Sequence, residues 1–229
     1  MARMFQQLVN KYPTELFVYM DDILIATKNN TPHHREIVNA VLALLDKESY
    51  FLRPSKCVFK QEQIKYLGII VDGNKLSINP SKADGLQNWL QVLKTVKEVR
   101  SILGVLGYQR PFIPHYMDIA KPLTELTKKD HPFSWTPECR NALDTLIFAV
   151  LNNPGLHQPD PSKLYTLQVD ASAYATGALL TQPDARGKHE AVGFHSQSFS
   201  EAERNFDIHD RELLALIQGL SHWHHLLIV

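Results

Sequence analysis

The sequence has little of what marks a secreted, membrane-bound or strongly basic protein. Its two cysteines, Cys57 and Cys139, lie far apart without a CxxC spacing, which indicates buried, reduced thiols and no disulfide framework. No run approaches the roughly 20 apolar residues that a membrane span needs, and residues 1–15 lack the apolar core of a signal peptide. We therefore expect an intracellular protein without a membrane partner.

Charge of one sign is also missing. The 229 residues carry 24 lysines and arginines against 24 aspartates and glutamates, so the formal net charge is zero. A nucleic acid or an anionic surface would therefore have to be held by a local cluster of cations, because no global positive field exists. With 44% hydrophobic and 21% charged residues, the composition is that of an ordinary soluble globular protein of one or two domains.

What is present is an acidic pair between two short apolar runs. Asp21 and Asp22 separate expected strands at 16–20 and 22–27, both rich in β-prone residues, so the pair should lie on the connection of a hairpin. Adjacent carboxylates repel, and a divalent cation relieves that repulsion. Magnesium or manganese fits better than zinc, because this stretch holds no Cys or His. The alternative is an Asp-Asp turn that merely ends a strand.

The residues around this pair predict an α+β module followed by helices. Thr31-Pro32 is a helix start, and helical spacing of apolar residues predicts a helix over 32–48. Strands are expected at 56–59, 64–70 and 76–78. Helical character then takes over, with expected starts at Asn79, Thr95, residue 116 and Thr136.

A second acidic pair lies in the last third of the chain. Residues 152–161 are dense in turn formers and read as a linker, after which we expect strands at 164–169, 176–182 and 190–196 and a helix at 207–226. Asp170 ends the first of these strands and Glu212 lies on the helix. If positions 213, 214, 216 and 217 face the sheet, Glu212 approaches Asp170, which would suit a magnesium site for phosphodiester chemistry. The alternative is a solvated helix face and a strand-end turn.

Several short motifs follow one another along the chain. They are Tyr19-Met20-Asp21-Asp22, Leu52-Arg53-Pro54-Ser55-Lys56-Cys57, Tyr66-Leu67-Gly68, Arg110-Pro111-Phe112-Ile113-Pro114, Ala120-Lys121-Pro122-Leu123-Thr124, Phe133-Ser134-Trp135-Thr136, Val169-Asp170-Ala171-Ser172, and Ala202-Glu203-Arg204-Asn205-Phe206 with Glu212-Leu213-Leu214-Ala215. In this order the sequence resembles the polyprotein of gypsy-type LTR retrotransposons over essentially its whole length.

The resemblance implies an α+β fold in three parts. Residues 1–78 would be a partial reverse transcriptase palm sheet, 79–153 a helical thumb or connection, and 154–229 an incomplete RNase H-like α/β domain. The implied activities are those of an RNA-directed DNA polymerase and a ribonuclease H. The implied partners are an RNA template, a DNA primer, deoxynucleoside triphosphates and an RNA–DNA hybrid, in the cytoplasm, a virus-like particle or the nucleus.

The resemblance also implies site roles. Asp21 and Asp22 correspond to the second and third carboxylates of the polymerase triad, which holds Mg²⁺ (or Mn²⁺), and Asp170 and Glu212 to the first two metal-binding carboxylates of the RNase H site. The residues that would position primer and template are Tyr19 and Met20 beneath the primer terminus and Tyr66, Leu67 and Gly68 in the primer grip.

The sequence departs from the family pattern in three places. The first aspartate of the triad and the fingers would lie upstream of Met1, and the later RNase H acids beyond Val229. Pro111 stands where many members carry a second arginine, which puts one thumb contact to the nucleic-acid backbone in question. We therefore expect a polyprotein fragment, truncated at both ends, whose activities need the missing segments. The alternative is a catalytically inactive retroelement remnant that at most binds nucleic acid or a partner.

Overall fold

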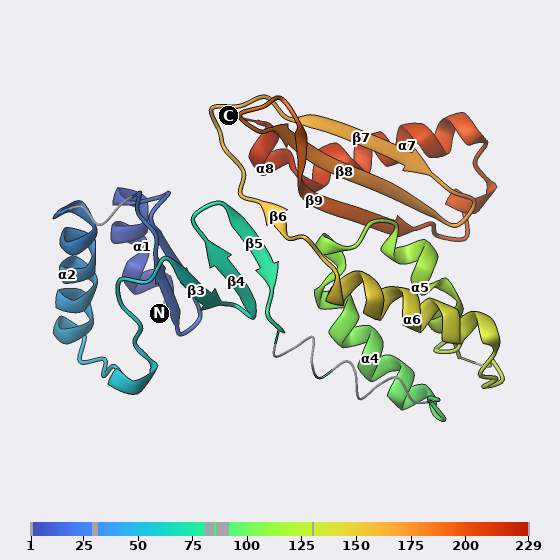
Figure 1. The fold of residues 1–229 in the computed structure, drawn as a ribbon, viewed down its shortest axis with the longest axis horizontal. Coiled ribbons are helices and arrows are strands. Elements are labelled where there is room, and N and C mark those ends of the chain that lie inside the picture. The colour runs from blue at the N-terminus through green and yellow to red at the C-terminus, as the bar shows by residue number, and fades with distance from the viewer. Residues whose placement is uncertain (1, 29–31, 81–84, 86–91, 130, 229) are drawn as a thin grey trace. The chain divides into compact units, whose positions relative to one another are not determined.

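The structure is a computed structural model that describes residues 2–28, 32–80, 85, 92–129 and 131–228 (Figure 1). The chain divides into two compact units, Met1–Gly73 and Asn74–Val229. The helix expected from Asn79 falls mostly outside the described residues, as does the capping residue Thr31. The domain boundaries proposed at 78/79 and 153/154 stay predictions.

The first unit packs two helices against a hairpin. Its elements are α1 (Ala2–Lys11), β1 (Leu16–Tyr19), β2 (Asp22–Ile25), α2 (Pro32–Lys47), the 3-10 turn η1 (Pro54–Lys56), β3 (Gln63–Tyr66) and β4 (Ile69–Asp72). Phe5 of α1, Leu16 of β1 and Ile37 of α2 are at most 1% exposed and form the core of this unit. The predicted helix 32–48 and the acidic hairpin are thereby confirmed.

Both hairpins of this unit close with two-residue turns. In the first, Tyr19 is opposite Asp22, so that Met20 and Asp21 form the turn. In the second, Tyr66 is opposite Ile69, with Leu67 and Gly68 between them. Leu67 (φ 46°) and Gly68 (φ 77°) are both left-handed, as the mirror-image type I′ turn requires.

The strand expected at 56–59 is wrong. Pro54–Lys56 form η1 instead, and residues 57–62 belong to no strand. The amide of Cys57 donates to the carbonyl of Pro54 at 3.0 Å, and its Sγ donates to the carbonyl of Arg53 at 3.4 Å. The Cys57 amide is thereby satisfied locally and is not left for pairing with a neighbouring strand.

The second unit combines a helical layer with a sheet. Its elements are β5 (Lys75–Ile78), α4 (Val96–Tyr108), η2 (Arg110–Phe112), α5 (Tyr116–Glu125), α6 (Pro137–Leu151), β6 (Leu156–His157), β7 (Thr166–Ala171), β8 (Ala175–Pro183), β9 (His189–Ser198), η3 (Glu203–Asn205), α7 (Ile208–His222) and α8 (His224–Leu227). The expected linker 152–161 contains β6, which pairs with β5.

Two helices of this unit begin where the sequence predicts. Thr95 accepts a hydrogen bond from the amide of Glu98 at 3.2 Å, and the Glu98 carboxylate accepts from the amide of Thr95 at 3.3 Å, which completes a capping box on α4. Thr136 accepts a hydrogen bond from the amide of Cys139 at 3.3 Å at the start of α6.

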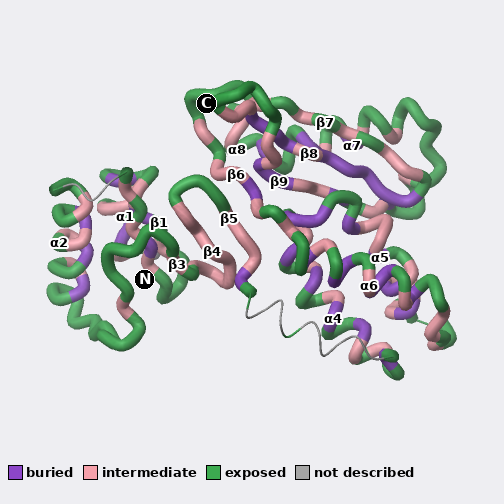
Figure 2. Tube along the Cα trace, viewed as in Figure 1, coloured by how far each residue is buried: buried purple, intermediate pink, exposed green. Residues whose placement is uncertain are grey.

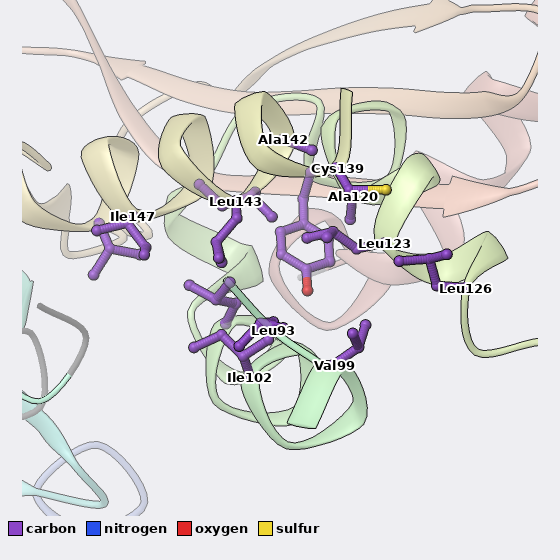
Figure 3. Close-up of a cluster of buried hydrophobic side chains, with 14 of the residues drawn as sticks. Leu93, Val99, Ile102, Ala120, Leu123, Leu126, Cys139, Ala142, Leu143 and Ile147 are labelled. Carbon is purple, nitrogen blue, oxygen red and sulfur yellow. The ribbon is translucent and has the colours of Figure 1, made fainter. Parts of the chain in front are cut away.

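The three helices α4, α5 and α6 enclose a core centred on Ile102, Leu123 and Leu143 (Figure 3). Cys139 is buried in it, whereas Cys57 is only half-buried.

The three strands expected after the linker are present, and they form a sheet with the antiparallel order β7-β8-β9. Figure 2 shows β8 buried along nearly its whole length. Helix α7 lies on one face, where a Cβ added at Gly219 would come within 3.3 Å of Leu167 and 3.4 Å of Ala178. On the opposite face, Ser196 of β9 accepts a hydrogen bond from the amide of Met117 at the start of α5, at 3.2 Å.

The expected orientation of α7 is wrong at three of its four positions. Leu213, Leu216 and Ile217 are 54%, 39% and 51% exposed, and only Leu214 is partly buried. The helix instead turns Ala215 and Gly219 to the sheet. These two small residues allow the helix axis to come close to the strands, and the large apolar residues then lie on the far side of the helix.

Among the described residues, no helix combines the length and apolar character needed to cross a membrane.

Replacing Leu143 by alanine tests the helical core. Leu143 is fully buried, so the Leu143→Ala variant should lose about 2–5 kcal/mol of unfolding free energy in urea denaturation. Phe148→Ala on the same helix is the matched control, because Phe148 is 67% exposed and its loss should stay within about 0.5 kcal/mol. Equal losses in the two variants would contradict the core described here.

Candidate functional site

The acidic pair of the first unit lies at the exposed tip of a buried hairpin. Leu16 and Leu24 anchor β1 and β2, at 1% and 8% exposure, whereas Tyr19 is 54% and Met20 71% exposed at the other end. Asp21 and Asp22 are exposed as well. Met20 has φ 51°, a left-handed conformation that costs a non-glycine residue about 1–2 kcal/mol. The apolar anchors therefore hold a strained turn that projects two carboxylates into solvent.

The second hairpin comes within electrostatic reach of the first. The pKa of Tyr66 is raised, mainly because the side chain is partly removed from water and also because the Asp22 carboxylate is nearby. The structure thus brings together Asp22 and Tyr66, two of the predicted site residues. Leu67 and Gly68 form the turn directly after Tyr66 and are half-buried.

Asp170 lies on the edge strand β7 and points away from α7. It is opposite Gly177 in the register, and a Cβ at Gly177 would meet the ring of His115 at 3.4 Å. Side chains alternate between the faces of a strand, so Asp170 belongs to the α5 side of the sheet, whereas Leu167 belongs to the α7 side. Two residues further on, the hydroxyl of Ser172 donates to the Asp118 carboxylate of α5 at 2.6 Å, which fixes this end of β7.

Glu212 lies exposed in the second turn of α7. The helix begins at Asp207, whose side chain accepts a hydrogen bond from the amide of Asp210 at 2.9 Å. Because α7 and Asp170 occupy opposite faces of the sheet, Glu212 and Asp170 can share an ion only around the β7 edge. Among the described residues, no group of three or more His, Cys, Asp or Glu is arranged to hold a metal ion.

The donor atoms available at both pairs suit a hard cation. Asp21 and Asp22 offer carboxylate oxygens only, as do Asp170 and Glu212, and oxygen ligands are those that Mg²⁺ and Mn²⁺ prefer. The four side chains are exposed, so water can complete the coordination. The chemistry of these donor atoms therefore fits a divalent cation.

A stacked histidine pair was missed by the sequence reasoning. The rings of His195 on β9 and His222 on α7 lie with their centroids 4.1 Å apart and their planes 21° from parallel, and Trp223 contacts both edge-on. Burial is the main cause that lowers the pKa of His195 to about 4, and His222 and Arg110 lower it further. The pKa of His222 is lowered by burial and by Arg110. The two histidines come from separate elements, so spacing in the sequence could not reveal the pair.

Two protein families match parts of the chain. Residues 1–71 match the family described as reverse transcriptase (RNA-dependent DNA polymerase), and residues 135–229 match the RNase H-like domain found in reverse transcriptase. Asp21 and Asp22 fall in the first match, and Asp170 and Glu212 in the second.

Similar proteins include transposon polyproteins of Schizosaccharomyces pombe. The Tf2-3 and Tf2-7 polyproteins are both 35% identical over 209 residues, which cover 91% of this chain and 16% of each relative. The chain thus spans only a small part of the length of these relatives.

Solved structures of foamy viral protease-reverse transcriptase share the fold. One, in complex with an RNA/DNA hybrid, has a TM-score of 0.79 at 24% identity and covers 96% of this chain and 30% of that chain. Another, in complex with double-stranded DNA, has a TM-score of 0.80 at 24% identity and covers 98% and 40%. The expected mixed fold of a reverse transcriptase with an RNase H-like domain is confirmed.

The buried histidine predicts a stability that depends on pH. In the unfolded chain His195 takes up a proton near its ordinary pKa of 6.5, whereas the folded protein resists protonation down to about pH 4. The unfolded state therefore binds more protons in this range, and the free energy of unfolding should fall as the pH drops from about 6.5 to about 4. Urea denaturation at a series of pH values measures this slope.

The His195→Gln variant should show a shallower slope over the same range. His131→Gln, at an exposed position, is the control and should keep the wild-type slope. An unchanged slope in His195→Gln would contradict the buried state of the imidazole.

Proposed function

Because the chain joins a reverse transcriptase segment at 1–71 to an RNase H-like domain at 135–229, we propose that it works as part of a retrotransposon RNA-directed DNA polymerase and ribonuclease H. The observation that carries this proposal is the occurrence of one acidic pair within each match, at 21–22 and at 170 and 212. The alignment to a transposon polyprotein spans 91% of the chain and therefore reaches into both matches.

In the proposed polymerase site, Asp21 and Asp22 hold Mg²⁺ or Mn²⁺ on the turn between β1 and β2. A divalent cation there would stabilise the negative charge that develops during nucleotidyl transfer to a primer 3′-hydroxyl. Tyr19 and Met20, exposed beside the pair, support the primer terminus. The turn formed by Tyr66, Leu67 and Gly68 positions the growing strand, which is supported by the electrostatic proximity of Tyr66 to Asp22.

In the proposed RNase H site, Asp170 and Glu212 act at the β7 edge. Asp170 approaches this edge from the α5 side of the sheet and Glu212 from α7. Together they would hold a divalent cation against the RNA strand of an RNA–DNA hybrid. The foamy viral structures, solved with an RNA/DNA hybrid and with double-stranded DNA, support nucleic acid as the partner of this fold.

We further propose that the 229 residues alone are inactive. Each acidic pair offers two carboxylates, and a two-metal site needs further ligands to hold both ions in place. The relatives extend far beyond the matched region, since the chain covers 16% of their length. Additional polyprotein segments would supply those ligands and the groups that bind template and deoxynucleoside triphosphate, in the cytoplasm, the nucleus or a virus-like particle.

Primer extension and hybrid cleavage test both sites in one design. In a longer polyprotein that contains this chain, Asp21→Asn should reduce Mg²⁺-dependent primer extension by about 100-fold or more, because a direct metal ligand is lost. Asp170→Asn should reduce hybrid cleavage by a similar factor. Each variant is the control for the other, because each should keep the activity of the unaltered site.

The same assays on the 229-residue chain should give no primer extension and at most weak cleavage. Robust extension by this chain would show that further ligands are dispensable. Loss of both activities in either single variant would indicate misfolding, and full activity in both variants would refute the assigned sites.

A further inference from the structure

A long irregular loop of the first unit displays apolar side chains to solvent. The 50–60 loop, between α2 and β3, exposes 97% of Phe51, 47% of Tyr50 and 54% of Phe59. Leu52 and Val58 are also exposed, at 44% and 57%. Figure 2 draws the segment that follows α2 as exposed almost throughout. Exposed apolar side chains that form a contiguous patch mark binding surfaces, and these five lie between residues 50 and 59 of one loop.

The cations of this loop decide which kind of partner it fits. Arg53, Lys56 and Lys60 are all exposed, and residues 50–60 contain no aspartate or glutamate. Within the described part of the chain, none of these three cations takes part in an ion pair. An apolar protein surface would gain nothing from them, whereas a polyanion that also carries flat apolar groups would contact both features.

The loop holds its aromatic side chains on a defined backbone. Helix α2 ends with Ser49 in a left-handed conformation (φ 58°), and the amide of Tyr50 donates to the carbonyl of Leu45 at 2.8 Å. This pattern is a Schellman motif, which fixes the direction in which the chain leaves a helix. Further along, η1 and the hydrogen bond from Cys57 to Pro54 keep Arg53 and Lys56 on one tight turn. Binding to this loop therefore costs less conformational entropy than binding to an extended flexible segment would.

We propose that the 50–60 loop binds a single-stranded stretch of nucleic acid. Bases of a single strand stack on exposed rings, here Tyr50, Phe51 and Phe59, and cations beside them contact the phosphates. A duplex offers less to this loop, because its bases are already stacked on each other. This inference rests on the proposed function, in which nucleic acid is the partner. It further specifies the protein surface that binds and that the bound nucleic acid is single-stranded.

Fluorescence polarisation with labelled oligo-dT and oligo-rU of 20 nucleotides tests the aromatic part. Phe51→Ala in the 229-residue chain should weaken binding of both probes about tenfold, a loss typical of one stacked base. Binding of a blunt duplex of the same length should change less than threefold. Phe148→Ala is the matched control, because Phe148 is also an exposed phenylalanine, at 67%, but lies on α6.

The salt dependence tests the electrostatic part. Each phosphate contact contributes about 0.7 to the slope of the logarithm of affinity against the logarithm of salt for a single strand. Lys56→Gln should reduce the slope by about that amount. Arg186→Gln, in the turn between β8 and β9, should leave the slope unchanged.

The outcomes separate this proposal from the function on which it rests. If the wild-type chain binds both single strands and Phe51→Ala binds them as tightly, the loop is not the binding surface, although nucleic acid remains the partner. If the wild-type chain binds neither single strand, the loop proposal is refuted, whereas the proposed function is judged separately by primer extension and hybrid cleavage in the longer polyprotein. Phe51 is almost fully exposed, so an unchanged urea midpoint in Phe51→Ala excludes unfolding as the cause of weaker binding.

Discussion

The burial of apolar side chains at the base of the β1–β2 hairpin is the interaction on which the first unit depends. The hairpin carries Asp21 in its turn and Asp22 at the start of β2, and the backbone strain at Met20 raises the energy of this turn. The hairpin tolerates this strain because Leu16 and Leu24 are buried at its base. A divalent cation would be attracted to the negative charge that this turn presents to solvent.

The second unit meets a different requirement, which is to hold a sheet between helices on both faces. Gly219 lets α7 approach Leu167 closely, and Ser196 accepts a hydrogen bond from the start of α5. Because helices contact both faces of the sheet, Asp170 and Glu212 of α7 can approach each other only at the β7 edge. The position of the proposed RNase H site thus follows from packing, as the position of the polymerase pair follows from the turn.

Local signals account for what the sequence predicted correctly. The starts of α4 and α6 could be predicted because each depends on a local hydrogen bond. The side chains of Thr95 and Thr136 accept it from the backbone amide three residues later. The acidic turn was equally local. Contacts between distant segments were not foreseeable: the outward-facing Leu213, Leu216 and Ile217, the stack of His195 on His222, and the pairing of β6 with β5 all depend on tertiary packing. The metal-binding roles of the two acidic pairs stay predictions from the sequence, and the sheet faces that separate Asp170 from Glu212 could not be predicted from it.

Paramagnetic broadening by Mn²⁺ tests the metal-binding role of the acidic turn most directly. In ¹H–¹⁵N spectra of the 229-residue chain, amide signals of Met20, Asp21 and Asp22 should broaden at the lowest Mn²⁺ concentrations, and excess Mg²⁺ should reverse the effect. Asp21→Asn should shift the broadening to much higher concentrations. If the β1–β2 signals stay sharp, or if Asp21→Asn broadens as the wild type does, the turn is not a cation site and the account of the first unit is wrong.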